Sequence, residues 1–270
     1  MSSAGKRGRR STSQPRAFVT YSGHESGDLA DTLENKKVKT DGTSKREKIL
    51  STPLSPANEA IFSTPLESWL TADRGSFSGW KCGVKNPVTM DKLQPVNSTD
   101  PFLRRIALYR GPVTDLELDA IVNAANTQCL GGGGVDGAIH RAAGPLLLRE
   151  CATFNGCETG ECRLTKGYQL PARYVFHTVG PVGEKPDLLR KCYRSVLSLA
   201  FRNRLRSIGF CCISTGVYGY PLLPATRIAL SETKNFLKEN ADAFDMCCFA
   251  CFQEEEFKTY SKCLKELSNL

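Results

Sequence analysis

The stretch Asp119-Ala-Ile-Val-Asn-Ala-Ala-Asn126 is followed four residues later by Gly131-Gly-Gly-Gly-Val-Asp136. The apolar residues at its start predict a buried strand that ends among two asparagines, Asn123 and Asn126. The consecutive glycines let backbone N–H groups approach a ligand closely, and they open a helical pattern that carries His140. A tight turn needs one glycine rather than four, and a helix N-terminus attracts anions, so this stretch predicts an anion-binding loop.

Strands and helices alternate on both sides of this loop. Compact apolar runs predict strands over 105–109, 118–123, 161–168, 173–179, 208–214 and 244–252. Apolar residues at helical spacing predict helices over 135–143, 188–199, 228–236 and 257–264. This alternation implies a three-layer α/β/α domain around a mixed sheet. Ligands bind such sheets beyond the carboxyl ends of the strands, where the glycine loop and a second loop, Ser214–Tyr218, both fall.

Five collinear stretches carry a resemblance to one family. They are Val122-Asn-Ala-Ala-Asn126, Gly131-Gly-Gly-Gly-Val-Asp-Gly137, His140-Arg-Ala-Ala-Gly-Pro145, Tyr174-Val-Phe-His-Thr-Val-Gly-Pro181 and Ile213-Ser-Thr-Gly-Val-Tyr-Gly219. Over roughly residues 100–268 the chain thereby resembles a MacroD-type macrodomain. The resemblance implies ADP-ribose binding and a hydrolase that removes mono-ADP-ribose from acidic side chains of modified proteins, with O-acetyl-ADP-ribose as a second substrate. The alternative is a non-catalytic module that only binds ADP-ribose.

By the same resemblance, catalytic roles are expected for Asn126, Asp136 and His140. Asp136 is the carboxylate of the glycine loop and stands where a helix begins, so the helix dipole favours its charged form. A charged carboxylate beside a sugar can accept a proton from water or from a ribose hydroxyl. Taken alone, Asp136 also fits an ordinary helix N-cap. His140 lies one helical turn beyond it and either tunes that carboxylate, contacts substrate or packs in the core.

The ligand-binding residues that the resemblance implies follow two strand ends and the two loops. Tyr218 is expected to cover the distal ribose, and Phe252 to stack on adenine. No metal and no cofactor is expected. The full expected set is Pro112, Val113, Thr114, Ile121, Asn123, Ala124, Ala125, Asn126, Gly131, Gly132, Gly133, Gly134, Val135, Asp136, Ile213, Ser214, Thr215, Gly216, Val217, Tyr218, Gly219 and Phe252.

The chain departs from the family at the end of the first strand. Family members usually carry Gly/Ser-Asp-Ile-Thr there, and the aspartate accepts a hydrogen bond from the adenine amino group. This chain has Gly111-Pro-Val-Thr114, and Pro112 offers neither a carboxylate nor an N–H. Asp115 is shifted by three residues and is the first candidate to replace the aspartate. Without a replacement, weak discrimination between bases is expected.

Other readings of the same residues are weaker. Gly132-x-Gly134-x-x-Gly137 matches a dinucleotide-binding pattern, but Ala124–Leu130 separate it from the strand that should precede it directly. Of the 12 cysteines, Cys248 and Cys251 have metal-like spacing without a second pair, so free buried cysteines in a reducing compartment are expected. The net charge of +8 comes without a basic patch interleaved with aromatics, so direct nucleic-acid binding is not expected. No span of 18 apolar residues is present, so no membrane insertion is expected. Nothing in the sequence sets an oligomeric state.

Residues 1–94 are expected to form a low-complexity basic tail, mostly disordered, with room for one short helix near 61–70. The macrodomain is then expected over 95–270 and should fold without the tail. Lys6-Arg-Gly-Arg-Arg10 is typical of a nuclear signal, and the acid-free, Ser/Arg-rich start also resembles a transit peptide that lacks an apolar face. The expected location is therefore nucleus and cytoplasm, with the mitochondrion as the less favoured alternative.

Overall fold

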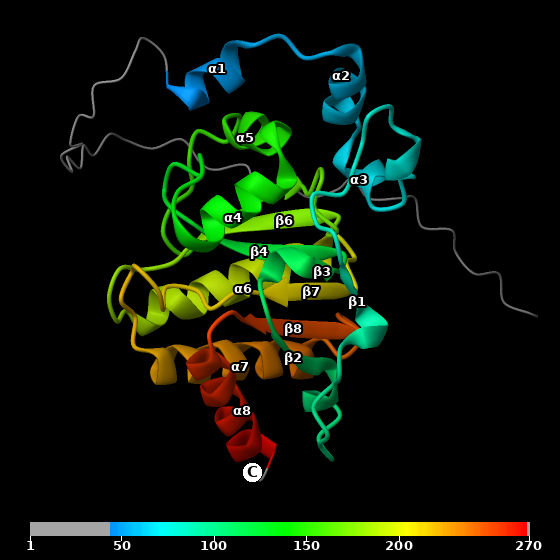
Figure 1. The fold of residues 1–270 in the computed structure, drawn as a ribbon. Coiled ribbons are helices and arrows are strands. Elements are labelled where there is room, and N and C mark those ends of the chain that lie inside the picture. The colour runs from blue at the N-terminus through cyan, green and yellow to red at the C-terminus, as the bar shows by residue number, and fades with distance from the viewer. Residues whose placement is uncertain (1–43, 269–270) are drawn as a thin grey trace, which may run out of the picture.

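The computed structural model describes residues 44–268. Its centre is a six-stranded sheet in the order β2-β8-β7-β4-β6-β5 (Figure 1). Neighbouring strands of this sheet run parallel, except that β5 is antiparallel to β6. The strands are β1 (Val88–Thr89), β2 (Ile106–Arg110), β3 (Leu116–Glu117), β4 (Ala120–Ala125), β5 (Cys162–Lys166), β6 (Tyr174–Val179), β7 (Ser207–Phe210) and β8 (Met246–Cys251).

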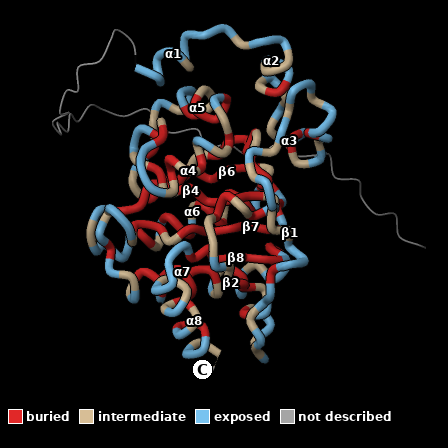
Figure 2. Tube along the Cα trace, in the orientation of Figure 1, coloured by how far each residue is buried: buried red, intermediate tan, exposed pale blue. Residues whose placement is uncertain are grey.

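Helices lie on both sides of the sheet (Figure 1). Strands β6 and β8 are buried along their whole length, as strands covered on both faces should be, and burial concentrates in the sheet (Figure 2). The predicted three-layer fold with a mixed central sheet is confirmed. The helices are α1 (Lys45–Ser51), α2 (Pro56–Ser63), α3 (Leu66–Trp69), α4 (Gly134–Ala143), α5 (Pro145–Cys151), α6 (Pro186–Arg202), α7 (Leu222–Glu239) and α8 (Glu254–Ser268), with 3-10 turns η1 (Arg74–Ser76), η2 (Met90–Lys92), η3 (Leu103–Arg105) and η4 (Val113–Asp115).

The parallel order brings the carboxyl ends of β4, β7 and β8 to one edge of the sheet. The predicted strand over 208–214 ends at Phe210, because the backbone beyond it turns into a loop in which Ser214 has φ +66°. Helix α4 begins at Gly134 and ends before Gly144, whose φ of +80° suits glycine. Both predicted loops therefore follow strands at the same edge.

The predicted boundary between residues 94 and 95 needs correction. Residues 44–94 hold three helices rather than one, and β1 pairs with β3 of the domain. Trp69 is fully buried in the common core, and its indole N–H donates to the Arg173 carbonyl at 2.7 Å. The buried Arg74 guanidinium donates to the carbonyls of Leu170 and Pro171, at 2.7 Å each. The segment is thus fixed by buried apolar residues, such as Ile61, Trp69 and Leu93, and by hydrogen bonds to residues about a hundred positions away.

Replacement of Trp69 by Ala should lower the free energy of unfolding by about 3–5 kcal/mol, because a fully buried indole is lost and the Arg173 carbonyl loses its donor. Urea unfolding followed by circular dichroism measures the change. Trp80→Ala is the matched control, since Trp80 is half-buried and should cost less. A loss below about 1 kcal/mol for Trp69→Ala would show that the segment only rests on the domain. For the same reason a chain starting near residue 95 should be strongly destabilised.

Residues 1–43 lie outside the described residues, and so do the Lys6–Arg10 signal and the first part of the predicted tail. Among the helices of residues 44–268, none has both the length and the apolar character needed to cross a membrane.

Candidate functional site

A cavity of about 560 Å³ opens beyond the carboxyl ends of β4, β7 and β8. Most of the predicted ligand-binding residues line it, from both loops and from the ends of β2 and β8. Those residues are Pro112, Val113, Thr114, Ala124, Asn126, Gly132, Gly133, Gly134, Val135, Asp136, Ser214, Thr215, Gly216, Val217, Tyr218 and Phe252. The two loops that lie far apart in sequence therefore face one cavity.

Several predicted residues do not line the cavity. Ile121 is fully buried in β4 and belongs to the core, because alternate side chains of a strand point to opposite faces. Asn123, Ala125, Gly131, His140, Ile213 and Gly219 also lie outside the lining, although Asn123 and His140 contact Asp136 from beneath it. The prediction missed Ala138, Arg141, Gly180, Cys211, Cys212, Ala250 and Glu256, which complete the wall.

The glycine loop uses its glycines for different reasons. Gly131 and Gly134 have φ of +78° and +56°, a conformation that side chains with a Cβ rarely adopt. A Cβ at Gly132 would lie 3.1 Å from Asp136 Oδ2, so the backbone passes directly over that carboxylate. At Gly133 a Cβ would meet open space. No side chain caps α4, so the N–H groups of its first turn remain available to an anion in the cavity.

Asp136 is held in place by contacts on one side of its carboxylate. Its Oδ1 accepts a hydrogen bond from Asn123 Nδ2 at 2.8 Å and lies 3.5 Å from His140 Nε2. Its Oδ2 is buried and has no hydrogen-bond partner among the described residues. Burial raises the pKa of Asp136, and the hydrogen bond from Asn123, His140 and the Arg46 charge oppose that rise. The residue is only 3% exposed yet lines the cavity, and its Oδ2 is a buried acceptor beneath the glycine loop.

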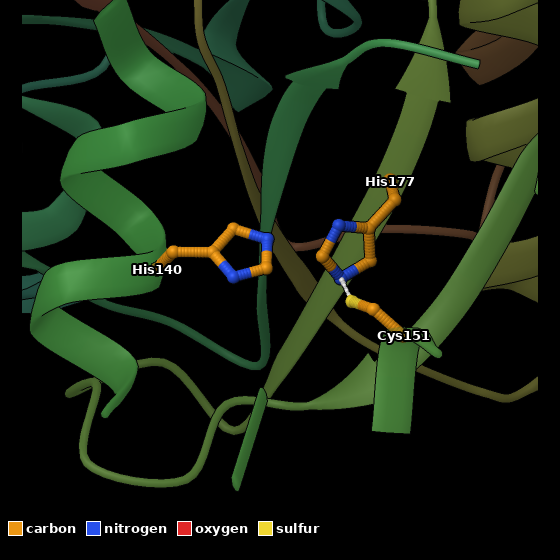
Figure 3. Close-up of side chains that lie close together, drawn as sticks. All are labelled: His140, Cys151 and His177. Atoms are coloured by element: carbon orange, nitrogen blue, oxygen red, sulfur yellow. Dashed lines mark hydrogen bonds between the residues drawn. The ribbon is translucent and has the colours of Figure 1, made fainter. Parts of the chain in front are cut away.

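A buried polar cluster supports Asp136 from below. Asn123 Nδ2 also lies 3.1 Å from Nδ1 of His177, whose Nε2 is 2.9 Å from the Thr165 hydroxyl. Figure 3 shows the His140 ring turned toward His177 and Cys151 Sγ next to His177, at 3.7 Å from Nε2. Burial lowers the pKa of His177 to about 3, so this ring is neutral and accepts from Asn123 through Nδ1. Asn123 therefore joins Asp136 to a neutral histidine.

The same cluster has the composition of a soft-metal site. Potential ligand atoms of His140, Cys151 and His177 all lie within 4.8 Å of one another. However, both ring nitrogens of His177 are already engaged by Asn123 and Thr165, and burial raises the pKa of the Cys151 thiol well above its usual value. The geometry therefore favours a hydrogen-bonded network that orients Asp136. His177, which the sequence marks only as a strand residue of the Tyr174–Pro181 stretch, is part of this network.

Asn126 is engaged by its own loop. Its Oδ1 accepts from the backbone N–H groups of Gln128 and Cys129 at 3.1 Å each, and its Nδ2 donates to the Gly131 carbonyl at 3.2 Å. One Nδ2 hydrogen is left for a ligand. Asn126 thus fixes the entry to the glycine loop as well as lining the cavity.

The second loop closes the opposite wall. Gly219 N–H donates to the Gly216 carbonyl at 2.9 Å, and Gly183 N–H donates to the Tyr218 carbonyl at 2.7 Å. Val217 at its tip is 97% exposed. Burial and the nearby Asp136 charge both raise the pKa of Tyr218, which lines the same cavity as Asp136. Hydrogen bonds thus hold the base of the second loop, while Val217 at its tip is exposed to solvent.

The far end of the cavity carries Pro112, Phe252 and Glu256. Phe252 is 72% exposed, an unusual state for phenylalanine that leaves the residue available for stacking. Asp115 accepts from the Tyr109 hydroxyl at 3.1 Å and does not line the cavity. Glu256 does, with Oε2 accepting from the Gln253 N–H at 2.9 Å, and its charge helps raise the pKa of the Cys212 thiol at the cavity wall. The carboxylate at this end is therefore Glu256.

Comparisons with known proteins agree with this geometry. The Macro domain profile matches residues 122–229. The chain is 52% identical over 200 residues to the ADP-ribose glycohydrolase MACROD2 of Homo sapiens, covering 71% of this chain and 47% of that protein. It is 49% identical over 168 residues to a macro domain-containing protein of Methanosarcina mazei, covering 60% of this chain and 89% of that one. The structure of a Trypanosoma brucei macrodomain in complex with ADP-ribose is 75% identical, with a TM-score of 0.80 over 83% of this chain and 97% of that chain. The chain spans about half the length of the MACROD2 proteins it matches.

Proposed function

The chain belongs to the macrodomain family, and on that premise we propose that it hydrolyses mono-ADP-ribose esters on Asp and Glu side chains, with O-acetyl-ADP-ribose as a second substrate. Two kinds of relative support the proposal. Proteins about 50% identical are named ADP-ribose glycohydrolases, and T. brucei macrodomain structures hold ADP and ADP-ribose.

The observation that carries the hydrolysis is the buried carboxylate of Asp136, a residue of the cavity lining whose Oδ2 has no hydrogen-bond partner among the described residues. A water molecule that hydrogen-bonds to Oδ2 would lose its proton to the carboxylate as it attacks the ester linkage. The bond that joins ADP-ribose to the modified side chain breaks, and the products are ADP-ribose and a free carboxylic acid. Attack at the sugar carbon and attack at the acyl carbon both use the same base, so the proposal holds for either route.

The remaining cavity wall fits the rest of ADP-ribose. The first-turn amides of α4 and the glycine loop suit the diphosphate, because fixed N–H donors bind it without a competing charge. Tyr218 lies near Asp136, where it would cover the distal ribose. Phe252 would stack on adenine at the other end. The ligand then extends from Asp136 to Phe252.

The test is release of ADP-ribose from a substrate protein. A protein that carries mono-ADP-ribose on acidic side chains, made with a labelled donor, is incubated with the full chain, and free label is separated from protein. Release above the uncatalysed rate is expected. A chain that binds ADP-ribose in calorimetric titration but releases no label would instead be a non-catalytic reader of the modification.

Glu256 is expected to accept the adenine amino group in place of the aspartate that Pro112 replaces. Gln keeps an acceptor oxygen but loses the charge, and a hydrogen bond to a charged group contributes about 1.5–3 kcal/mol against about 1 kcal/mol for a neutral one, so Glu256→Gln should weaken ADP-ribose binding about tenfold. Gln at this position can still cap α8, so the fold is kept. Calorimetric titration with ADP-ribose and its inosine analogue measures both affinity and base preference.

Glu255→Gln is the control, because Glu255 stands in the same helical turn but is exposed and does not line the cavity. Equal affinity of the wild type for the adenine and inosine ligands would show that no carboxylate reads the base. The weak discrimination expected from Pro112 alone would then hold.

A further inference from the structure

Helix α1 lies against the site from outside the macrodomain sequence. It packs on α5, and none of its own residues is buried. Arg46 near its start donates to the Gly131 carbonyl at 2.7 Å, across 85 residues of sequence. At its end, Arg149 of α5 donates to the Thr52 carbonyl. A helix with no fully buried residue is thus held by an arginine contact at each end.

The Gly131 carbonyl oxygen accepts hydrogen bonds from two separate parts of the chain, α1 and the segment that leads into the glycine loop. Asn126 Nδ2 donates to the same oxygen at 3.2 Å. Gly131 has φ +78°, and a Cβ there would lie 3.3 Å from the His140 ring. The next residue, Gly132, passes over Asp136 Oδ2. The orientation of the Gly131 peptide therefore decides how the loop covers the carboxylate.

We propose that Arg46 is a positioning residue for hydrolysis, holding the Gly131 carbonyl so that the glycine loop presents Asp136 and Asn126 to the distal ribose. This inference rests on the proposed function, since it concerns the same reaction. It assigns a role to the segment before the macrodomain: α1 completes the outer side of the glycine loop.

The Arg46 charge acts in the same direction as its hydrogen bond. It lowers the pKa of Asp136 and also that of His140, so it favours a charged carboxylate beside a neutral imidazole. A general base needs this protonation state. The other titratable groups that sense or face Asp136 are His140 on α4, Cys151 on α5, Cys211 beyond β7 and Tyr218 in the second loop.

Three substitutions separate the bond from the charge. Arg46→Ala removes both, Arg46→Gln keeps a donor without charge, and Arg46→Lys keeps the charge with less reach. Lys48→Ala is the matched control, because Lys48 is an exposed cation on the same helix without a contact to the loop among the described hydrogen bonds and ion pairs. The full chain is used throughout.

Arg46→Ala should lower kcat about tenfold while the Kd for free ADP-ribose changes less than about threefold, because the diphosphate donors remain. In Arg46→Ala and Arg46→Gln the acid limb of the pH profile of kcat should move to higher pH, since the pKa of Asp136 rises when the nearby positive charge is lost. In Arg46→Lys the limb should stay in place. Lys48→Ala should behave as wild type.

Amide hydrogen exchange of residues 131–136 gives a readout that does not depend on turnover, and Arg46→Ala should speed exchange there. If the wild type releases no ADP-ribose, the proposed function is wrong. Amide hydrogen exchange still tests whether the contact between Arg46 and the Gly131 carbonyl holds the glycine loop. If Arg46→Ala has the same kcat, pH profile and amide exchange as the wild type, the inference is overturned. An equal loss in Lys48→Ala would overturn it as well, because it would mark a general effect of positive charge.

Discussion

Replacement of Asp136 by Ala should slow ADP-ribose release by about 10²–10⁴-fold, the range over which a positioned general base contributes. Binding of free ADP-ribose should change little, because the proposed diphosphate donors are backbone amides of the glycine loop and α4. Single-turnover release gives the rate, and calorimetric titration gives the affinity. The effect is large because Asp136 lines the cavity and its Oδ2 is an acceptor without a hydrogen-bond partner among the described residues.

Asp136→Asn separates the base from the structural role of this side chain. Its amide oxygen can still accept from Asn123, but it cannot take a proton from water. Rates should fall as in Asp136→Ala. A wild-type rate in both variants would show that Asp136 only begins a helix, and another base would be needed.

The burial of Asp136 also sets the expected pH dependence of kcat in the wild type. Because burial raises the pKa of Asp136, the acid limb of kcat should lie above the usual range of an aspartate. The raised pKa also means that the folded state holds the proton more tightly, so stability is lost as pH rises through that pKa. Asp136→Asn should therefore be more stable than wild type at neutral pH, and the difference should vanish in acid. Thermal unfolding across that range measures it.

The sheet and the site loops were predictable because local pattern and function coincide there. The apolar run before Asn123 is a buried parallel strand, and such strands end where ligands bind. The glycine loop follows soon after this strand, and positive φ or close approach requires glycine at Gly131, Gly132 and Gly134. At these positions the type of residue follows from its own backbone conformation and its own close contacts, so the sequence predicts the local structure.

Residues 44–94 were mispredicted because their order depends on distant partners. Lys166 in β5 donates to the carbonyls of Phe62 and Thr64 at 2.6 and 2.7 Å, and Arg74 reaches the turn at 170–172. These contacts satisfy backbone groups of the segment. No local pattern records them, and the available sequence signal was the scattered apolar residues Ile61, Phe62, Leu66, Trp69 and Leu70.

The set of cavity-lining residues predicted from the sequence was incomplete for a related reason. Glu256 stands in the first turn of α8, just past the carboxyl end of β8, and reaches the cavity because that strand neighbours β2 and Pro112. Ligands bind beyond the carboxyl ends of the strands, and this principle, which identified the other two loops, applies to the end of β8 as well. In contrast, Arg46 carries no sequence signal, because its contact with Gly131 exists only after α1 has packed on α5.

Gly133→Glu should abolish ADP-ribose binding, with a loss of about a thousandfold or more. Gly133 lines the cavity at the N-terminus of α4, has an ordinary φ of −93° and offers open space to a new side chain. The substitution therefore adds a carboxylate where the diphosphate is proposed to bind, without straining the backbone. A negative charge about 4 Å from one phosphate charge costs roughly 4 kcal/mol at an effective dielectric constant of 20, or about three decades in affinity.

Gly133→Gln is the matched control, because it has the size of Glu without the charge. Calorimetric titration should show ADP-ribose affinity nearer to wild type for Gln than for Glu, and the gap should narrow as salt screens the repulsion. Gly134 would be a poorer choice, since its φ of +56° strains any side chain and confounds the result. Equal losses for Gln and Glu would show that bulk alone blocks the loop. Wild-type binding by Gly133→Glu would mean that the diphosphate does not lie at the N-terminus of α4, and the proposed placement of ADP-ribose in this cavity would fail.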